Sequence, residues 1–151
     1  MNQLIGVLAM DSPITYEQPD DREAFETLFL SFTQALQVLS HDAATQCEEM
    51  GNYNAPWEIQ HDVQDGCFLL LRSPETHLTG EQSEALRDLT EALEDLPREA
   101  VAPTGMTTTN HEGCLTAMRH PAWISLRERA VPLLQLLVPL IQKNAAYFKG
   151  Q

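Results

Sequence analysis

Basic residues are scarce in this sequence, whose 151 residues include nine lysines and arginines against 22 aspartates and glutamates. The formal net charge is −13 at pH 7. A negative field of this size repels nucleic acids and anionic membrane surfaces and attracts cationic proteins. Basic and aromatic residues are also not interleaved in the way that nucleic-acid recognition needs. We therefore expect the partner to be a cationic protein, and neither a nucleic acid nor a membrane.

Cysteines and glycine-rich loops are also in short supply. The three cysteines, Cys47, Cys67 and Cys114, form no C-x-x-C pair, which predicts reduced thiols and no disulfide framework or zinc site. The seven glycines are dispersed, so no phosphate-binding loop is expected. Cys47 and Cys67 lie among apolar residues and should be buried and inert, which leaves Cys114 as the remaining candidate nucleophile.

Long apolar runs are absent as well. The run "AVPLLQLLVPLI" has twelve residues and two prolines, which is too short to span a bilayer. The beginning, "MNQLIGVLAMDSP", has no basic residue before its apolar part, so a secretory signal is not expected. These features and the unpaired cysteines together predict a cytoplasmic protein.

Hydrophobic residues make up 43% of the chain and charged residues 21%, as in an ordinary folded domain. The length fits one domain, over residues 1–151. The charge, however, is uneven. Residues 1–86 hold 15 acids and two bases, whereas residues 87–151 hold seven of each. The excess acid therefore belongs to the first half of the chain. Solubility alone is the alternative reason for such an excess.

Apolar residues recur at helical spacing in three long segments, over residues 20–51, 79–96 and 121–149. The first begins with a capping pattern at Asp20 and can continue to Gly51. An unbroken helix of that length would be ~45 Å long, so we expect a kink near Ser40 and His41. The apolar face of its first part consists of Phe25, Leu28, Phe29, Phe32, Leu36 and Leu39.

The other two segments carry their own boundary signals. Thr79 and Gln82 stand in capping-box register at the beginning of the 79–96 helix, and Pro97 ends it. In the last segment, Pro132 and Pro139 should kink the helix or divide it. Between these segments, a short helix capped at residue 110 should run through residue 118. Long amphipathic helices joined by short loops predict a mainly α, single-domain helical bundle.

Residues 52–71 are the ambiguous part of the chain. The stretch "GNYNAPWEIQHDVQDG" fits a polar connector or a short helix that begins at Pro56. The run "CFLLL", residues 67–71, should be buried, and its periodicity fits an extended segment as well as a helix. Both alternatives stay open.

No constellation of residues in the sequence carries a catalytic signature. Glu58 and His61 have the Glu-x-x-His spacing of helical di-iron sites, but such a site needs a second copy, which the sequence lacks. Cys114 has His111 and Glu112 beside it on one short segment, which does not make a triad. We therefore expect no enzyme activity, no cofactor and no metal. A helical carboxylate–histidine metalloprotein is the least favoured alternative.

The stretch "EALRDLTEALEDL", residues 84–96, places leucines on one helix face and carboxylates on the opposite face. The leucine face should pack inward, so the acidic face meets water or a partner. The acidic row consists of Glu81, Glu84, Asp88, Glu91 and Asp95. A second group, around Trp57 with Asp62 and Asp65, combines an aromatic anchor with acids, as protein-binding patches do; a tryptophan folded into the core is the alternative, and the sequence slightly favours it.

A resemblance to a known family rests on the acidic first helix, on "APWEIQHDVQDG" followed by "CFLLL", and on the ending "RHPAWISLRERA…NAAYF". In these features the chain resembles small acidic immunity proteins of bacterial polymorphic toxin systems, including contact-dependent growth inhibition. The resemblance covers roughly residues 50–149 and brings no catalytic residues. It implies a cytoplasmic protein that binds the C-terminal domain of a secreted toxin, often a nuclease with a basic cleft, as a monomer or in a 1:1 heterodimer.

Carboxylates of such an inhibitor would pair with the toxin's lysines and arginines and raise the association rate. The predicted partner-binding residues are Glu81, Glu84, Asp88, Glu91, Asp95, Asp21, Glu26, Trp57, Asp62 and Asp65. An acidic adaptor or secretion chaperone is the alternative function.

Overall fold

The computed structural model of the protein describes residues 19–51, 53–73 and 78–149, and for residues 19–21 and 148 it describes the backbone alone. This part of the chain forms helices and no strands, so the predicted mainly α fold is confirmed. The helices are α1 (Pro19–Leu39), α2 (Ala43–Glu49), α3 (Ala55–Arg72), α4 (Gly80–Glu94), α5 (Arg98–Val101), α6 (His111–Met118), α7 (Ala122–Leu136) and α8 (Val138–Lys149). The apolar run at residues 4–10 lies outside the described residues.

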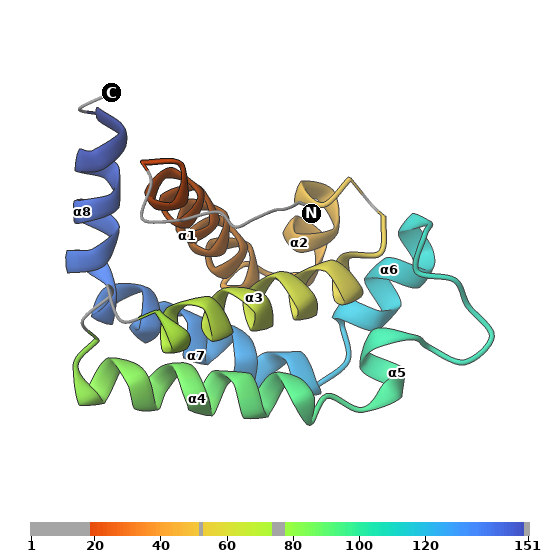
Figure 1. Ribbon diagram of the computed structural model, residues 1–151. Coiled ribbons are helices and arrows are strands. Elements are labelled where there is room, and N and C mark those ends of the chain that lie inside the picture. Colours follow the sequence, from red (N-terminus) through yellow and green to blue (C-terminus); the bar gives the residue numbers. More distant parts are fainter. Residues whose placement is uncertain (1–18, 52, 74–77, 150–151) are drawn as a thin grey trace, which may run out of the picture.

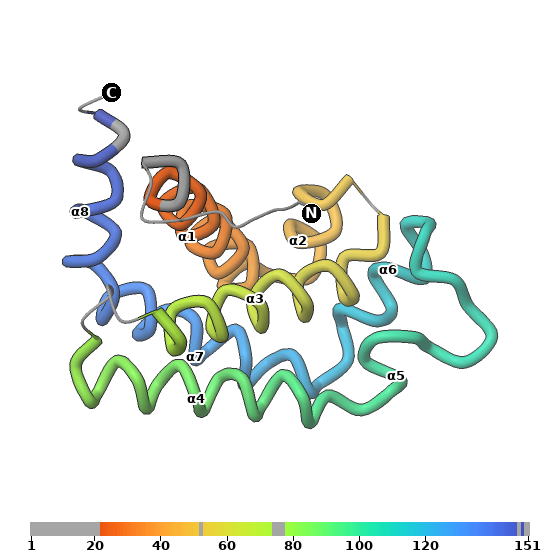
Figure 2. Tube along the Cα trace, in the orientation of Figure 1, coloured from red at the N-terminus to blue at the C-terminus, as the bar shows by residue number. Residues whose placement is uncertain are grey.

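Four helices enclose the core, because α1 and α4 each pack against both α3 and α7. Figure 1 shows α3 and α4 running alongside each other, with α1 crossing them steeply and α8 standing at one end of the molecule. The short helices α2, α5 and α6 gather at the other end. Figure 2 follows the same path as a tube, in which α4 and α7 lie side by side although residues 95–121 separate them in the sequence. None of the described helices has both the length and the apolar character that crossing a membrane requires.

The kink expected near Ser40 and His41 is a complete break between α1 and α2. Asp42 begins α2 as its N-cap, and its Oδ1 accepts a hydrogen bond of 2.8 Å from the Thr45 backbone N–H. This bond satisfies one of the free N–H groups of the first turn and lowers the pKa of the Asp42 carboxyl. Gly51 follows α2 with a φ of 72°, the left-handed conformation that favours glycine after a helix.

Residues 67–71 are helical, so the extended alternative for this run is wrong. They belong to the last turns of α3, which begins after Asn54 and carries Pro56 in its first turn. The run is continuously apolar because its solvent-facing position also holds an apolar residue. Phe68 is 41% exposed, whereas Cys67 and Leu70 are buried. The connector alternative for residues 52–66 is likewise wrong from residue 55 onward, because α3 is one helix throughout.

Glycine allows α1 and α3 to approach closely. A Cβ atom at Gly66 would lie 2.1 Å from Cδ1 of Phe32, a core residue of α1. Non-bonded carbon atoms do not approach each other this closely. The Phe32 side chain therefore occupies the space that the Cβ atom of any other residue at position 66 would need. The amino acid at this position therefore sets the distance between the two helices.

The boundaries of α4 and of the last two helices follow the sequence signals. The capping box forms at α4, where Gln82 N–H donates to Thr79 Oγ1 at 3.0 Å and Thr79 N–H donates to Gln82 Oε1 at 2.9 Å. The 121–149 segment divides at Leu137 into α7 and α8, and Pro139 stands in the first turn of α8, where its missing N–H leaves no bond broken. Pro132 remains inside α7.

Candidate functional site

The α4 helix separates apolar and acidic residues as the sequence predicts. Leu86, Leu89 and Leu93 are buried in the core. The five carboxylates of the acidic row all lie on the exposed side: Glu81, Glu84, Asp88, Glu91 and Asp95. Within the described part of the chain, none of these five side chains forms an ion pair or a side-chain hydrogen bond. They therefore present negative charge that no ion pair within the described residues compensates.

A groove runs between α4 and α7 along this acidic row. Its first part has a volume of about 450 Å³, with Asp88, Glu91 and Asp95 on one wall and Ser125 and Arg129 on the other. The second part has a volume of about 270 Å³ and continues past Asp88 and Arg129 to Glu81. Because both parts share residues 88 and 129, we treat them as one feature, the α4/α7 groove.

The α4/α7 groove combines acidic walls with an apolar floor. Four carboxylates line it against one base, Arg129, which is exposed and whose Nε–H donates to Ser125 Oγ at 3.3 Å. The apolar part of the lining includes Leu126, Leu133 and Leu136. A lysine or arginine side chain suits such a groove, because its hydrocarbon stem can cover apolar surface while its charge reaches a carboxylate.

Sequence reasoning missed the α7 wall of this groove. Ser125, Arg129, Pro132 and Leu136 follow one another at intervals of three or four residues, so they form one stripe along α7. The spacing was visible in the sequence. What it could not indicate was that this stripe faces α4, because that depends on how the two helices pack.

The second predicted patch lies on α3, apart from the groove. Trp57 is 45% exposed, which excludes the alternative of a core tryptophan, and its ring stacks on that of His61 with centroids 4.0 Å apart. Asp62 and Asp65 are exposed as well. Gln60 marks the side of α3 that faces α4, since its amide donates to Leu93 O at 2.8 Å.

Helical rotation places the α3 acids on the far side from α4. At ~100° per residue, Asp62 is turned about 200° from Gln60, and Asp65 about 140°. Partial burial, with the nearby charges of Glu58 and Asp65, raises the pKa of Asp62. The ten predicted partner-binding residues therefore do not form one surface: four line the groove, Glu84 lies beside it, and the α3 group faces another direction.

Glu26 of α1, another predicted partner-binding residue, joins neither surface. Glu26 is 5% exposed and lies between α1 and α8, so the prediction that it faces a partner is wrong. It stands beside Phe25 and Phe29 on the inner side of α1, where α8 covers it. The side chain of Asp21 lies outside the described part of the structure.

The three cysteines are free and buried. Burial, with the neighbouring Cys114 thiol as a second cause, raises the pKa of Cys47 to about 12, and burial raises that of Cys67 to about 11. Cys114 is completely buried too, which removes it as a candidate nucleophile open to substrate. Over the described residues, no group of three or more histidine, cysteine, aspartate or glutamate side chains is arranged to hold a metal ion.

Searches of protein-family models, of curated proteins and of solved structures find no match for this chain.

Proposed function

We propose that the protein binds a cationic protein domain in the α4/α7 groove and neutralises it, as a cytoplasmic immunity protein does with its toxin. The observation that carries this proposal is the row of exposed carboxylates on α4, which lacks ion-pairing partners in the described part of the chain. A row of unpaired like charges gains nothing for the fold, because neighbouring carboxylates repel each other. A basic partner would relieve that repulsion.

The groove suits an inhibitor of an enzyme that handles phosphates. The active-site cleft of such an enzyme is basic, and carboxylates placed in it would compete with the substrate's phosphates for the same lysines and arginines. Charge complementarity also speeds association, since opposite fields steer the two proteins together. The apolar floor around Leu133 and Leu136 would add contact area once the charged rims have met.

Reversing two groove carboxylates should test this proposal. In the double variant Asp88→Lys and Glu91→Lys, two attractive charges become repulsive at the middle of the groove, so we expect binding of the cognate toxin domain to weaken by about 100-fold or more. If the reading frame immediately upstream of this gene encodes a secreted protein with a basic C-terminal domain, that domain is the partner to use. Affinity is measured by surface plasmon resonance at two salt concentrations, and protection by survival of cells that express the domain.

The matched control is the double variant Glu48→Lys and Glu112→Lys. Both residues are exposed, lie on α2 and α6, and line no part of the groove, yet the change in net charge is the same. We expect this control to keep most of the affinity. Equal loss in both variants would assign the effect to net charge, and unchanged binding and protection by the Asp88/Glu91 variant would exclude the groove as the interface.

An acidic adaptor or secretion chaperone is the second candidate, and exposed aromatic residues favour it. Tyr53 is 59% exposed, Trp57 45% and Phe68 41%. A chaperone of this kind would use such residues to cover an apolar client segment and would form a stable dimer. Light scattering on the purified chain distinguishes the two functions, because the immunity protein should be a monomer that forms a 1:1 complex.

A further inference from the structure

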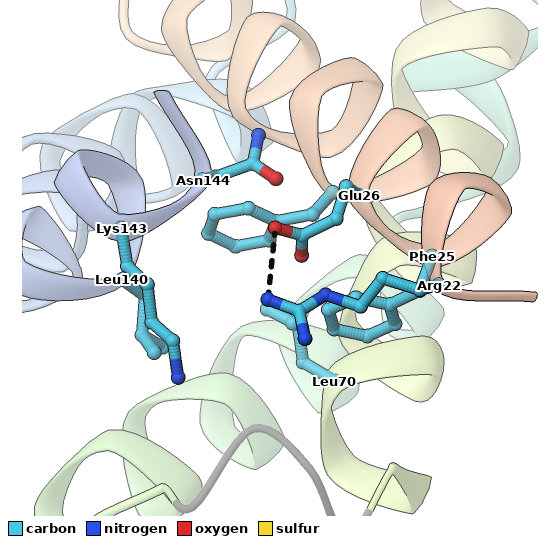
Figure 3. A pocket seen from close by; sticks show the side chains of 8 residues that line it. Arg22, Phe25, Glu26, Leu70, Leu140, Lys143 and Asn144 are labelled. Carbon is cyan, nitrogen blue, oxygen red and sulfur yellow. Dashed lines mark ion pairs between the residues drawn. The ribbon is translucent and has the colours of Figure 1, made fainter. Parts of the chain in front are cut away.

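A small cavity lies at the junction of α1, α3 and α8, on a part of the molecule that the proposed function does not use. Its volume is about 60 Å³. Figure 3 shows Glu26 at its centre, with the side chains of Arg22, Lys143 and Asn144 around it. The remaining lining is apolar and consists of Phe25, Phe29, Leu70 and Leu140.

Glu26 is buried with part of its hydrogen-bonding capacity unused. Its side chain is 7% exposed, and Oε2 lies 3.9 Å from Nη2 of Arg22, which is beyond hydrogen-bond length. When the Asn144 amide is turned over from the orientation drawn in Figure 3, its nitrogen donates to Oε2 and to the Glu26 main-chain oxygen, both at 3.2 Å. Among the described residues, no donor reaches Oε1. A buried carboxylate oxygen without a donor is costly, so a ligand that brings an N–H group would be favoured.

Two cations stand on the solvent side of the same cavity. The Arg22 side chain is 51% exposed and is held over the ring of Tyr147, with Cζ 5.1 Å from the ring centroid. Lys143 is exposed and lines the cavity, and it forms no ion pair with any described residue. A simple amine would be repelled by these two charges, and a simple carboxylate would be repelled by Glu26. A ligand with an ammonium at one end and a carboxylate at the other matches both.

The volume limits the size of such a ligand. One water-sized atom occupies about 10–15 Å³ of this kind of space, so the cavity holds about four to six atoms. Glycine and alanine fall in this range, with five and six non-hydrogen atoms. The apolar wall of Phe29 and Leu140 would accommodate the Cα atom and a methyl group.

We propose that this cavity is a binding site for a free α-amino acid with a small side chain. The ligand's ammonium group donates hydrogen bonds to the Glu26 carboxylate, while the ligand's carboxylate accepts them from Arg22 and Lys143. Asn144 fixes the position of the Glu26 carboxylate through its amide nitrogen.

Calorimetric titration of the full chain with glycine and with alanine tests the proposal. We expect saturable binding with a Kd of about 1 mM, as befits a ligand of so few atoms. Acetate and methylammonium carry one of the two charges each, and both should bind at least about tenfold more weakly than glycine. Leucine should bind more weakly than alanine, because its side chain exceeds the cavity.

Two variants and one control locate the binding. Glu26→Gln keeps the shape of the side chain and removes its charge, and Lys143→Gln changes an exposed residue that the fold does not need. Each should weaken glycine binding about tenfold or more. Lys149→Gln, on the same helix but outside the lining, should bind like the wild type.

The absence of saturable binding by both amino acids would overturn the proposal and leave a cavity that holds water only. Acetate binding as tightly as glycine, or undiminished glycine binding by Lys143→Gln, would also overturn it. The groove variant Asp88→Lys and Glu91→Lys should bind glycine normally, so failure here and failure of the proposed function are separate results.

Discussion

Replacing Gly66 by alanine should destabilise the fold by about 3 kcal/mol, even though alanine is the better helix former. The added Cβ would lie 2.1, 2.5 and 2.7 Å from Cδ1, Cγ and Cβ of Phe32. A ring can rotate away from a contact at its tip, but the Cβ of Phe32 is fixed to the backbone of α1. Relief therefore requires α1 and α3 to move apart, which opens the core on both sides of the contact. For a chain of this size, the midpoint of thermal unfolding should fall by about 10 °C.

Gly80 provides the matched control, because a Cβ there meets no atom within 4 Å. Gly80→Ala at the first position of α4 should change the free energy of unfolding by about 0.5 kcal/mol or less. Circular dichroism during heating measures both variants. A Gly66→Ala protein that unfolds at or above the wild-type temperature would show that the two helices do not approach as closely as described.

The elements of this fold were predictable where hydrophobic periodicity and capping signals agree. In α4, the leucines repeat at helical spacing and Thr79 and Gln82 mark the first turn, so both the helix and its exposed acidic row follow from the sequence. In α3, the same periodicity is present in Ile59, Val63 and Leu70, but the acids and amides between these positions, and Pro56 before them, resemble a connector. The continuous apolar run at the end of the helix then hides its exposed face, because Phe68 is apolar and yet solvent-exposed.

The candidate sites were predictable only in part, since each is completed by a helix distant in sequence. The carboxylates of the groove belong to one helix and could be found from their spacing. Arg129, on the opposite wall, depends on the packing of α7 against α4. Glu26 shows the same limit. It lies at the edge of the apolar face of α1, and it is buried because α8 packs over it.

Gln46 should be the polar residue whose loss affects stability most. It is completely buried in α2, and its amide nitrogen donates to Val38 O at 3.2 Å and to Leu39 O at 3.0 Å, at the end of α1. Its Oε1 accepts from Nε and Nη2 of Arg127 at 3.2 and 2.9 Å. Arg127 also donates to Met118 O. One amide thus connects α1, α2 and α7, and through Arg127 it reaches the end of α6.

Gln46→Ala should lower the free energy of unfolding by about 3–4 kcal/mol, because it creates a void and removes a donor from Leu39 O, while the Arg127 guanidinium keeps only its bond to Met118 O. Partial burial lowers the pKa of Arg127, whose guanidinium stays protonated and therefore needs acceptors for its N–H groups. Urea unfolding measures the loss, and Gln34→Ala is the control, since Gln34 is exposed on α1 and its side chain forms no hydrogen bond with any described residue. That control should change stability by about 0.5 kcal/mol or less.

A double-mutant cycle with Arg127→Ala separates the loss of this connection from the loss of packing. If the hydrogen bonds between the Gln46 amide and the Arg127 guanidinium stabilise the fold, the double variant should lose about 1–3 kcal/mol less than the sum of the two single losses. The reason is that the second substitution removes a group that the first has already left unpaired. Additive losses would mean that Gln46 acts through its bonds to α1 alone, and that the contact between α2 and α7 contributes little to stability.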